Sequence, residues 1–517
     1  MANVTQVGPT LSGFTLDVLR WYPDRIAFAW EGGALTYAGA SDLIGRMQSV
    51  FAAHGLRRGS CVALLSGNRA ETWCALIAAQ ASGMAVTWVL YFSSLEDQEH
   101  QLRDAGADVL IVDVSRAERG GELAARTDQL SQVFTLGPLG FGVDLIAAAG
   151  KVGAVSPRSF AEPEDVAFIS YTGGTTGYPK GAVRRHSPSS SQTFASILSD
   201  FEIPKNPRFL MIGPLSHVSG VKVLPTLMRG GSVHLLSDVT TDHILSVIER
   251  ERINFTLMMP SMIYAMLNSL DNRKADLSCL ELLLYGGASM APERLREGMD
   301  RLGPVFAQLY GQTECYPISY LSRGDHDPNR PELLASCGRP AVSAAVTILD
   351  SDGVEIRDGG VGEICVRSPM VMDGYKNLPD LTAETFRNGW LHTGDVGRMD
   401  DGGYLYILDR LNDLIVMSSG PNVYPRGLEE VLVEHEAVSQ AAVFGTSDEE
   451  TGEAVNVVVV LRGDSKVSAE ELQSYVRARK GHVQVPRYVH FVDEMPLTSL
   501  GKVDKNALRV RVAEQAV

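Results

Sequence analysis

Apolar runs alternate with helical patterns along the first third of the chain. Apolar residues recur at helical spacing between positions 43 and 51, and a short apolar run follows at 62–65. A second helical pattern covers about 71–81, and strand-like runs follow at 86–90 and 109–112. Because strands that alternate with helices pair in parallel, this pattern predicts an α/β layer on a mostly parallel sheet.

The C-terminal part of the chain carries its own alternation. Residues 455–461 form an almost purely apolar run that predicts a strand. Residues 468–480 predict a helix that begins at a serine N-cap, Ser468, with glutamates in its first turn. A chain of 517 residues is too long for one compact core. We therefore expect at least two domains, of which the C-terminal one is small.

Composition and charge narrow the class of protein. The chain is 45% hydrophobic and 21% charged, as in ordinary globular proteins, and its formal net charge is −16. A negative surface repels phosphate backbones, so we expect no nucleic-acid partner. The 6 cysteines form no CxxC pair, which indicates reduced thiols in a cytoplasmic protein. Polar residues interrupt the most apolar stretch, 77–92, so we expect no transmembrane segment, and no signal-peptide pattern opens the chain.

A loop rich in glycine and hydroxyl groups follows an apolar run at 165–170. It reads Ser-Tyr-Thr-Gly-Gly-Thr-Thr-Gly-Tyr-Pro-Lys-Gly from Ser170 to Gly181. Glycines let the backbone approach a ligand, and hydroxyl and ammonium groups donate to the many acceptor oxygens of a polyphosphate. It is not a Walker loop, because Pro179 precedes the lysine and Gly181 follows it. We interpret it as a phosphate loop rather than a surface turn, with the candidate ligands Thr172, Gly173, Gly174, Thr175, Thr176, Gly177 and Lys180.

Further polar motifs follow this loop. They read Gly-Pro-Leu-Ser-His-Val-Ser-Gly (213–220), Leu-Tyr-Gly-Gly-Ala-Ser (284–289), Tyr-Gly-Gln-Thr-Glu (310–314), Trp-Leu-His-Thr-Gly-Asp (390–395), Asp-Arg-Leu-Asn-Asp (409–413), Ser-Ser-Gly-Pro-Asn-Val-Tyr-Pro (418–425) and Pro-Leu-Thr-Ser-Leu-Gly-Lys (496–502). A carboxylate such as Glu314 suits Mg²⁺, a hard cation that also takes phosphate oxygens. Asp395 can accept from two vicinal hydroxyls and so hold a ribose. Lys502, on a glycine-preceded loop, can meet negative charge at a reacting phosphate.

In their order along the chain, these motifs resemble those of the adenylate-forming superfamily, which includes acyl-CoA synthetases, firefly-type luciferases and peptide-synthetase adenylation domains. The resemblance implies a large N-terminal multi-layer α/β domain at 1–410 and a small mobile C-terminal α+β domain at 411–517. It implies a reaction in which a carboxylic acid attacks ATP in the presence of Mg²⁺, releasing pyrophosphate, and the thiol of coenzyme A then displaces AMP. The small domain would rotate between these half-reactions about a hinge at Asn412, exchanging the loop of Lys502 for that of Gly420.

The resemblance also implies roles for single residues. Lys502, Thr313, Glu314 and His217 would be catalytic, and Thr172 and Glu314 would bind the metal. Besides the phosphate loop, the residues that hold nucleotide or coenzyme A would be Gly287, Ala288, Tyr310, Gly311, Asp395, Arg410 and Gly420. The acid would lie against Val218, Gly220, Met259, Tyr285, Gly286, Leu309 and Cys315. Because this lining is largely apolar, we expect a fatty or aryl acid with no charge to match.

Three positions depart from the superfamily's pattern. Asn412 stands where relatives usually carry aspartate or lysine, Gly427 replaces a glutamate, and Leu309 replaces a common glycine. Two alternatives to a CoA ligase therefore stay open, an adenylating enzyme with another acceptor and a non-catalytic nucleotide-binding relative. Arg184 and Arg185 are expected to be a solvated pair rather than a site for CoA phosphates. The oligomeric state is also open, with a homodimer among the options.

Overall fold

The structure, a computed structural model, forms two compact units. It describes residues 10–515 except 92, 173–177, 188–192, 195–196, 199, 237, 272, 289, 416–422, 449–451, 464, 483 and 498–502, and the side chains of 412, 452 and 513–515 are also outside the description. The N-terminal unit comprises Met1–Ala345 with Arg367–Leu391, and the C-terminal unit comprises Val346–Val366 with His392–Val517. The predicted domain border between residues 410 and 411 marks where the mobile part of the chain begins, and it stays a prediction.

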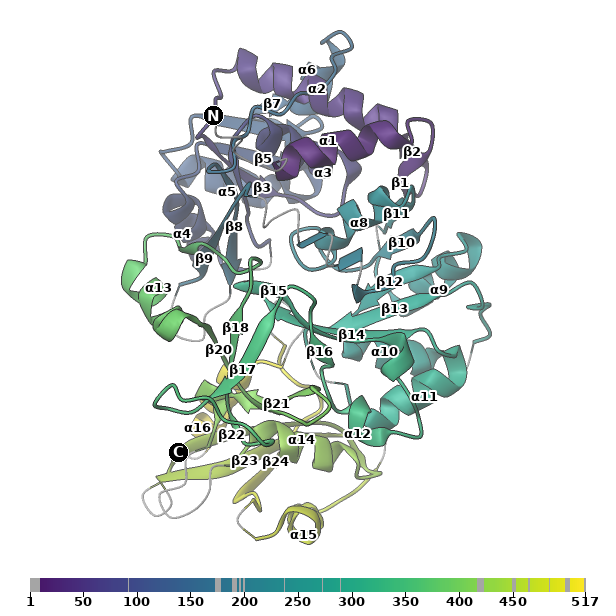
Figure 1. Ribbon diagram of the computed structural model, residues 1–517, viewed down its shortest axis with the longest axis vertical. Coiled ribbons are helices and arrows are strands. Elements are labelled where there is room, and N and C mark those ends of the chain that lie inside the picture. Colours follow the sequence, from purple (N-terminus) through teal and green to yellow (C-terminus); the bar gives the residue numbers. More distant parts are fainter. Residues whose placement is uncertain are drawn as a thin grey trace, which may run out of the picture. The chain divides into compact units, whose positions relative to one another are not determined.

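An eight-stranded sheet forms one layer of the N-terminal unit (Figure 1). Its order is β19 (Gly374–Tyr375), β9 (Lys180–Arg185), β8 (Val166–Thr172), β4 (Ala85–Trp88), β3 (Cys61–Leu65), β5 (Val109–Asp113), β6 (Gln132–Leu136) and β7 (Val143–Asp144). The strands from β8 to β7 pair in parallel, and β9 and β19 add an antiparallel edge. The predicted parallel sheet is therefore confirmed, with strands close to the expected positions.

Helices supply the apolar side chains that cover this sheet. They are α1 (Leu11–Trp21), α2 (Tyr37–Ala53), α3 (Ala70–Ala81), α4 (Leu95–Ala105), α5 (Ala117–Arg126) and α6 (Leu145–Gly150). In α2, one face of the helix is buried, which includes Ile44, Met47 and Phe51 at helical spacing. Helix α3 is buried on nearly every side, from Trp73 to Ala81. The most apolar stretch of the sequence thus begins in a core helix, and no helix among the described residues has the length and hydropathy needed to cross a membrane.

A nine-stranded sheet forms the second layer of the N-terminal unit. Its order is β16 (Arg339–Pro340), β15 (Cys315–Leu321), β14 (Phe306–Gln312), β13 (Leu282–Gly286), β12 (Phe255–Met258), β10 (Arg208–Met211), β11 (Ser232–Leu235), β1 (Ile26–Trp30) and β2 (Gly33–Thr36). Its helices are α8 (Val223–Met228), α9 (Thr241–Arg250), α10 (Pro260–Ser269), α11 (Pro292–Leu302) and α12 (Pro331–Leu334), and α13 (Pro379–Thr385) lies beside β19. Alternate side chains of β13 belong to two different hydrophobic cores, one on each face of the sheet, because successive side chains of a strand point to opposite faces.

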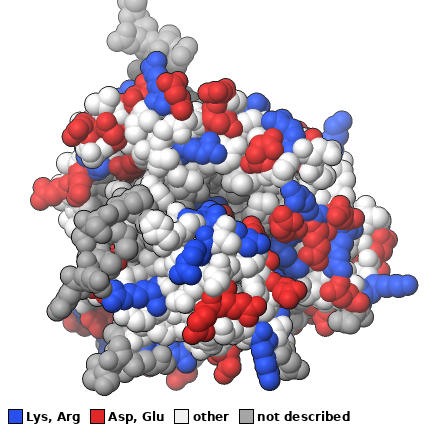
Figure 2. Space-filling model, turned by 90° about the horizontal axis from the view of Figure 1, so that it is seen from below, with Lys and Arg blue, Asp and Glu red and all other residues white. Residues whose placement is uncertain are grey.

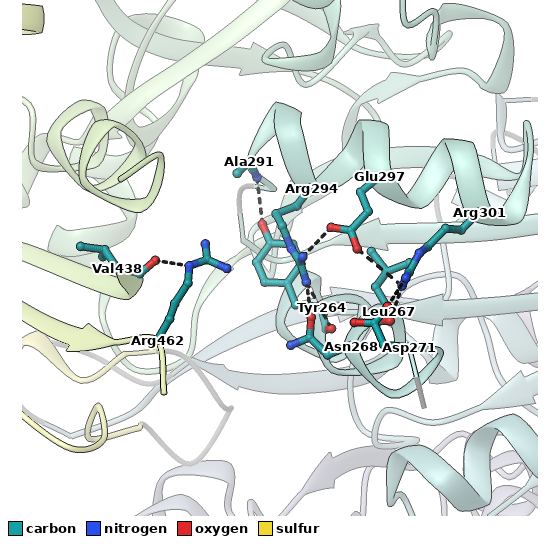
Figure 3. A network of polar contacts seen from close by, with 10 residues as sticks. All are labelled: Tyr264, Leu267, Asn268, Asp271, Ala291, Arg294, Glu297, Arg301, Val438 and Arg462. Atoms are coloured by element: carbon teal, nitrogen blue, oxygen red, sulfur yellow. Dashed lines mark hydrogen bonds and ion pairs between the residues drawn. The ribbon is translucent and has the colours of Figure 1, made fainter. Parts of the chain in front are cut away.

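Polar contacts fasten α11 to α10 (Figure 3). Arg294 of α11 donates to the carboxylate of Glu297 and, at 2.7 Å, to the side-chain oxygen of Asn268 on α10. Arg301, two helical turns further along α11, donates to Asp271 just beyond α10. Ion pairs with partly exposed side chains add little stability, each about 0–1 kcal/mol. The network therefore sets the orientation of the two helices, while the apolar core supplies the stability.

The C-terminal unit combines two small sheets with three helices. One sheet contains β17 (Ala345–Leu349), β18 (Gly362–Arg367), β20 (Leu391–Met399) and β21 (Leu405–Arg410), and the other contains β22 (Val438–Asp448), β23 (Gly452–Leu461) and β24 (Tyr488–Phe491). The helices are α14 (Pro425–Val433), α15 (Ala469–Lys480) and α16 (Lys505–Gln515). The hydroxyl of Ser468 accepts from the backbone of Glu471, which confirms the predicted N-cap of α15. Arg462 donates from Nε to the carbonyl of Val438 at 2.8 Å and so ties the end of β23 to β22 (Figure 3).

Charged side chains of both signs mix on the surface. On the face drawn in Figure 2, lysine and arginine lie among aspartate and glutamate over short distances.

Candidate active site

The predicted phosphate loop joins β8 to β9, which pair as antiparallel neighbours. Thr172, the last residue of β8, lies directly opposite Lys180, the first residue of β9. The base of the loop therefore presents a hydroxyl and an ammonium group side by side. The five residues between, Gly173, Gly174, Thr175, Thr176 and Gly177, lie outside the described residues, so their part in phosphate binding stays a prediction.

Glu314 lies in the tight turn between β14 and β15, where Gln312 pairs with Cys315. The hydroxyl of Tyr375 on β19 donates to Glu314 Oε1 at 2.6 Å. Burial, and then the charge of Glu314, raises the pKa of Tyr375 well above its ordinary value, so the hydroxyl keeps its proton and donates. The ammonium of Lys180 lies 6.0 Å from the centre of the same tyrosine ring. Tyr375 therefore links the predicted metal ligand to the base of the phosphate loop.

Arg184 of β9 holds the same turn from another side. Its guanidinium donates to the carbonyl of Thr313 at 2.9 Å and to the carbonyl of Met370 at 2.5 Å. Burial lowers the pKa of Arg184, but arginine keeps its charge in proteins. Arg184 is therefore a half-buried anchor of the Thr313–Glu314 turn, which differs from the expected solvated pair, whereas its neighbour Arg185 is exposed.

The donor set at this turn fits Mg²⁺. Glu314 offers carboxylate oxygens that Tyr375 orients, and Thr172 offers a hydroxyl at the base of the neighbouring hairpin. Hard oxygen donors, completed by phosphate oxygens, are what Mg²⁺ prefers in proteins. When bound, the ion would neutralise charge on the phosphates. The two residues named as metal ligands from the sequence belong to different sheets of the same unit, Thr172 at the end of β8 and Glu314 in the turn between β14 and β15, and the ligation itself stays a prediction.

His217 lies in a compact turn that other residues shape. The side chain of Asn68 donates to a carbonyl at the start of this turn and accepts from the N–H of Leu215 at 2.7 Å. Ser216 Oγ lies 2.7 Å from His217 Nδ1, and this contact orients the imidazole ring. Gly220 closes the turn, where an added Cβ would lie 1.8 Å from the carbonyl oxygen of Leu215. Only glycine fits at this position.

The predicted adenine turn lies at the carboxyl end of β13. Gly286 is opposite Leu309 of β14, and a Cβ at Gly286 would lie 2.6 Å from the carbonyl oxygen of Leu309. Gly287 has a φ of +78° with open space around it, a left-handed conformation that favours glycine. Gly287 and Ala288 are exposed. Ligands of α/β sheets commonly bind at the carboxyl ends of strands, which agrees with this placement.

The residues named for the acid pocket divide between two cores. Leu309 belongs to one core, and Val218 packs against that core. Tyr285 faces the other core, where its hydroxyl bonds to His326 Nε2 at 3.0 Å. The structure therefore brings Val218 and Leu309 to the same core, while the side chain of Tyr285 points to the opposite face of the sheet. The remaining members are buried Cys315 and half-buried Met259 and Gly220. Of the residues named for the nucleotide, Tyr310 is buried and Gly311 is half-buried.

In the C-terminal unit, Asp395 and Arg410 form a pair. They lie opposite each other on β20 and β21, and Arg410 Nε is 2.7 Å from Asp395 Oδ1. The aspartate side chain is 4% exposed and the arginine side chain 54% exposed. Gly394, with a φ of +70°, allows the sharp backbone conformation just before Asp395. Both residues that the sequence indicates for ribose and phosphate are thus adjacent.

Glu363 of β18 organises the same segment. Its carboxylate accepts from the backbone N–H of Gly394 at 3.0 Å and contacts His392 Nδ1 at 2.7 Å. The hydroxyl of Thr393 donates to the carbonyl of Ile364 at 2.7 Å and accepts from the N–H of Asp395. The position of Asp395 is therefore set by side chains of the neighbouring strand.

The predicted hinge, Asn412, lies in a short 3-10 turn at Leu411–Asp413. Just before it, the buried carboxylate of Asp409 accepts from the backbone N–H groups of Arg410 and Arg426. Burial raises the pKa of Asp409 above its ordinary value. Glu429, beside the Gly427 departure, accepts from Lys505 at 2.8 Å and so has a structural contact. Gly420 and Lys502 lie outside the described residues, and their roles stay predictions.

Sequence reasoning gave no positioning role to three residues that hold motif residues in place, Arg184 and Tyr375 in the N-terminal unit and Glu363 in the C-terminal unit. Each acts through a partner that is distant in the sequence, such as Tyr375 on Glu314, 61 residues away. Nothing in the local pattern marks such partners, because the fold alone brings them together. For Tyr375 and Glu363 the available signal was their place in Gly374-Tyr375 and Gly362-Glu363, which resemble a structural strand segment of the superfamily, whereas Arg184 has no such signal.

Comparisons with known proteins agree with this arrangement. A family model described as "AMP-binding enzyme" matches residues 17–376, and one described as "AMP-binding enzyme C-terminal domain" matches 427–502. The chain is 44% identical to a medium/long-chain-fatty-acid–CoA ligase of Mycobacterium tuberculosis, over 98% of this chain and 91% of that protein. It is 34% identical to a feruloyl-CoA synthase of Amycolatopsis, over 95% of this chain and 97% of that protein. Among solved structures, an amide bond synthetase from Marinactinospora thermotolerans matches with a TM-score of 0.89 and 33% identity, over 97% of this chain and 99% of that chain.

Proposed function

Because the chain belongs to the AMP-binding enzyme family, we propose that it is an ATP-dependent carboxylic acid:CoA ligase that works in two half-reactions. It is an acyl-CoA synthetase of the adenylate-forming superfamily, and it uses ATP and coenzyme A. The structural observation that carries this conclusion is the arrangement around Tyr375, which joins Glu314 to the base of the phosphate loop.

In the first half-reaction, an oxygen of the acid attacks the α-phosphorus of ATP. A bond from carboxylate oxygen to phosphorus forms, the bond to pyrophosphate breaks, and acyl-AMP and pyrophosphate result. Thr172 and Lys180 bind phosphate oxygens, Thr313 contacts the α-phosphate, and Glu314 holds Mg²⁺. The protein contributes positioning and charge stabilisation, and Lys502 adds a cation to the charge that develops at the reacting oxygens.

In the second half-reaction, the sulfur of coenzyme A attacks the acyl carbonyl carbon. A thioester bond forms, the thiol proton leaves to solvent, and AMP departs with the oxygen that joined it to the acyl group. Asp395 and Arg410 hold the ribose and phosphate of AMP, and the loop of Gly420 admits the thiol-bearing arm. The hinge at Asn412 exchanges the loops of Lys502 and Gly420 between the two steps.

The substrate is a fatty or aryl acid. Leu309 and Val218 give the pocket an apolar wall, which matches the acids named for the two curated relatives, a medium or long-chain fatty acid and ferulate. A cytoplasmic place in the cell agrees with the supply of ATP and coenzyme A there. The acceptor needs a direct test, because one solved relative is an amide bond synthetase.

The test measures pyrophosphate release from ATP and Mg²⁺ with a panel of acids, each with and without coenzyme A. The panel spans short to long fatty acids, benzoate, cinnamate and ferulate types, and amino acids. We expect CoA-dependent turnover with one class of acid. In the Glu314→Gln variant, turnover should fall by about 100-fold or more, since a metal ligand and its charge are lost.

The matched control is Glu355→Gln, which removes an exposed carboxylate in the C-terminal unit and should leave turnover unchanged. Pyrophosphate release without stimulation by coenzyme A would indicate another acceptor. Silence across the panel would contradict the ligase function and support a non-catalytic nucleotide-binding protein.

A further inference from the structure

A fully buried lysine lies behind the predicted acid pocket. Lys222 follows the His217 turn directly and is 0% exposed. Its ammonium donates to the hydroxyl of Tyr316 and lies 5.1 Å from the ring centre of Phe201. Within the described part of the chain, no carboxylate forms an ion pair with it. Lysine is almost never fully buried unless it is paired, so this one calls for an explanation.

The aromatic side chains around Lys222 belong to the acid-binding side of the fold. Tyr316 packs against the same core as Leu309 and Val218. The ring of Tyr316 also lies against the Tyr310–Glu314 motif, because a Cβ at Gly311 would come within 2.8 Å of Tyr316 Cδ2. The side chain of Tyr316 therefore contacts both the Lys222 ammonium and the backbone of the Tyr310–Glu314 motif.

The hydrogen bond between these two residues has a direction. Lys222 Nζ lies within hydrogen-bonding distance of the tyrosine oxygen. When a nearby anion restores the charge of Lys222, its ammonium has donors and no acceptor, so it donates to that oxygen and the O–H of Tyr316 donates to the anion. Tyr316 is half-buried and Lys222 is fully enclosed, so of the two only the tyrosine has surface that a ligand can contact.

An unpaired ammonium in this place is unfavourable without a ligand. Burial holds the pKa of Lys222 well below its ordinary value, because a charge loses its hydration there. Removing one partner from a buried ion pair is costly, and supplying the missing partner reverses that cost. An anionic group placed against Tyr316 would supply it.

We propose that Lys222 and Tyr316 form a polar subsite of the acid pocket that recognises a second carboxylate at the far end of the substrate. The first carboxylate of such an acid reacts with ATP, and the second accepts from the Tyr316 hydroxyl while Lys222 balances its charge. This inference rests on the proposed ligase function, and it replaces the expectation of an acid without a charge to match. Lys222, acting through Tyr316, is a specificity-determining residue.

The experiment compares matched acids in the pyrophosphate assay. Hexanoate, octanoate and decanoate are each set against the dicarboxylate of equal length, namely adipate, suberate and sebacate, and against the ω-hydroxy acid. An aryl set adds cinnamate and 4-carboxycinnamate. In the unaltered protein we expect kcat/KM to favour one dicarboxylate over its monoacid by about 100-fold or more, as for sites built to bond a substrate polar group.

Single-residue variants distinguish loss of the polar subsite from general damage to the fold. Lys222→Met and Tyr316→Phe should abolish the preference for the dicarboxylate and raise kcat/KM for the monoacid. Tyr320→Phe is the matched control, because Tyr320 packs on Phe201 in the same core and, among the described residues, makes no hydrogen bond or ring contact with Lys222. It should keep the preference. A thermal melt of Lys222→Met, which we expect to be at least as stable as the unaltered protein, shows that loss of preference is not loss of the fold.

Two results would overturn the assignment while leaving the ligase function intact. One is a preference for monoacids that Lys222→Met does not change, and the other is a preference for the hydroxy acid over the dicarboxylate. Failure to release pyrophosphate with every acid would instead overturn the ligase function, and this inference with it.

Discussion

At the scale of single residues, the site depends on side chains that hold other side chains. Arg184 bonds to the carbonyls of Thr313 and Met370, and Tyr375 bonds to the carboxylate of Glu314. If Glu314 binds Mg²⁺ as proposed, a carboxylate that rotates freely would bind the ion less tightly, because ordering the side chain costs free energy each time the ion binds. These two residues keep Glu314 in place before any ligand arrives.

We predict that Arg184→Lys slows pyrophosphate release by about 10- to 100-fold, because a lysine cannot bridge two carbonyls with a planar fork. The concentration of Mg²⁺ needed for half-maximal rate should rise as the turn loosens. The measurement is a Mg²⁺ titration of turnover. Arg185→Lys, on the exposed neighbouring residue, is the control, and equal effects of both changes would contradict the positioning role.

Candidate residues could be named from the sequence where the chemistry is local to a motif, and their roles stay predictions. Glu314, Asp395 and Arg410 were all named from the sequence, and the structure places Asp395 and Arg410 2.7 Å apart. From the sequence we expect Arg184 and Arg185 to be a solvated pair, whereas Arg184 is half-buried. Its burial depends on carbonyls 129 and 186 residues away, which no local pattern specifies.

At the scale of elements, periodicity was sufficient for the strands and helices with strong patterns. The apolar runs at 62–65 and 109–112 became β3 and β5, and Ser468 begins α15 as expected. The antiparallel pairing of β9 with β8 and the two cores on either side of β13 were not predicted. Both depend on contacts across the sheet, and a short apolar run does not reveal which face meets which helix.

The turn that carries His217 depends on a glycine. We predict that Gly220→Ala destabilises the N-terminal unit by about 1–3 kcal/mol, because the added methyl would have to displace the carbonyl of Leu215. The Michaelis constant for the acid should also rise as the turn shifts. Chemical denaturation and acid titrations measure the two effects. Gly153→Ala is the matched control, since nothing lies within 4 Å of a Cβ there.

An unchanged denaturation midpoint in Gly220→Ala would show that the turn is free to rearrange. The denaturation midpoint and the Michaelis constant together distinguish a role of Gly220 in acid binding from a role in the stability of the unit. A shift in the Michaelis constant without a loss of stability would place Gly220 at the acid rather than in the support of the turn.

At the scale of the whole molecule, buried neutral histidines make the fold sensitive to acid. Burial lowers the pKa of His186, His234 and His326 to about 4 in each case. For His326, Nδ1–H donates to the carbonyl of Ser322, so Nε2 accepts from the hydroxyl of Tyr285. A proton on Nε2 would remove that acceptor.

The sign of the pH dependence follows. Above pH 6.5 these histidines are neutral in both states and do not affect stability. As the pH falls from 6.5 towards 4, the unfolded chain takes up protons that the folded chain does not. Each histidine then costs stability, about 2 kcal/mol at pH 5. We predict a falling thermal midpoint between pH 6.5 and 4 and a shallower fall in His326→Gln, and a flat profile over this range would contradict the account.

The central claim is that one chain carries out adenylation and then thioester formation. The most direct measurement incubates the protein with ATP, Mg²⁺ and an acid that it turns over, first without and then with coenzyme A, and identifies the products by mass spectrometry. The account predicts acyl-AMP and pyrophosphate before coenzyme A is added, and acyl-CoA and AMP afterwards. Lys502→Ala should fail in the first step yet form acyl-CoA from supplied acyl-AMP. Release of ADP and orthophosphate, or equal loss of both steps in Lys502→Ala, would contradict it.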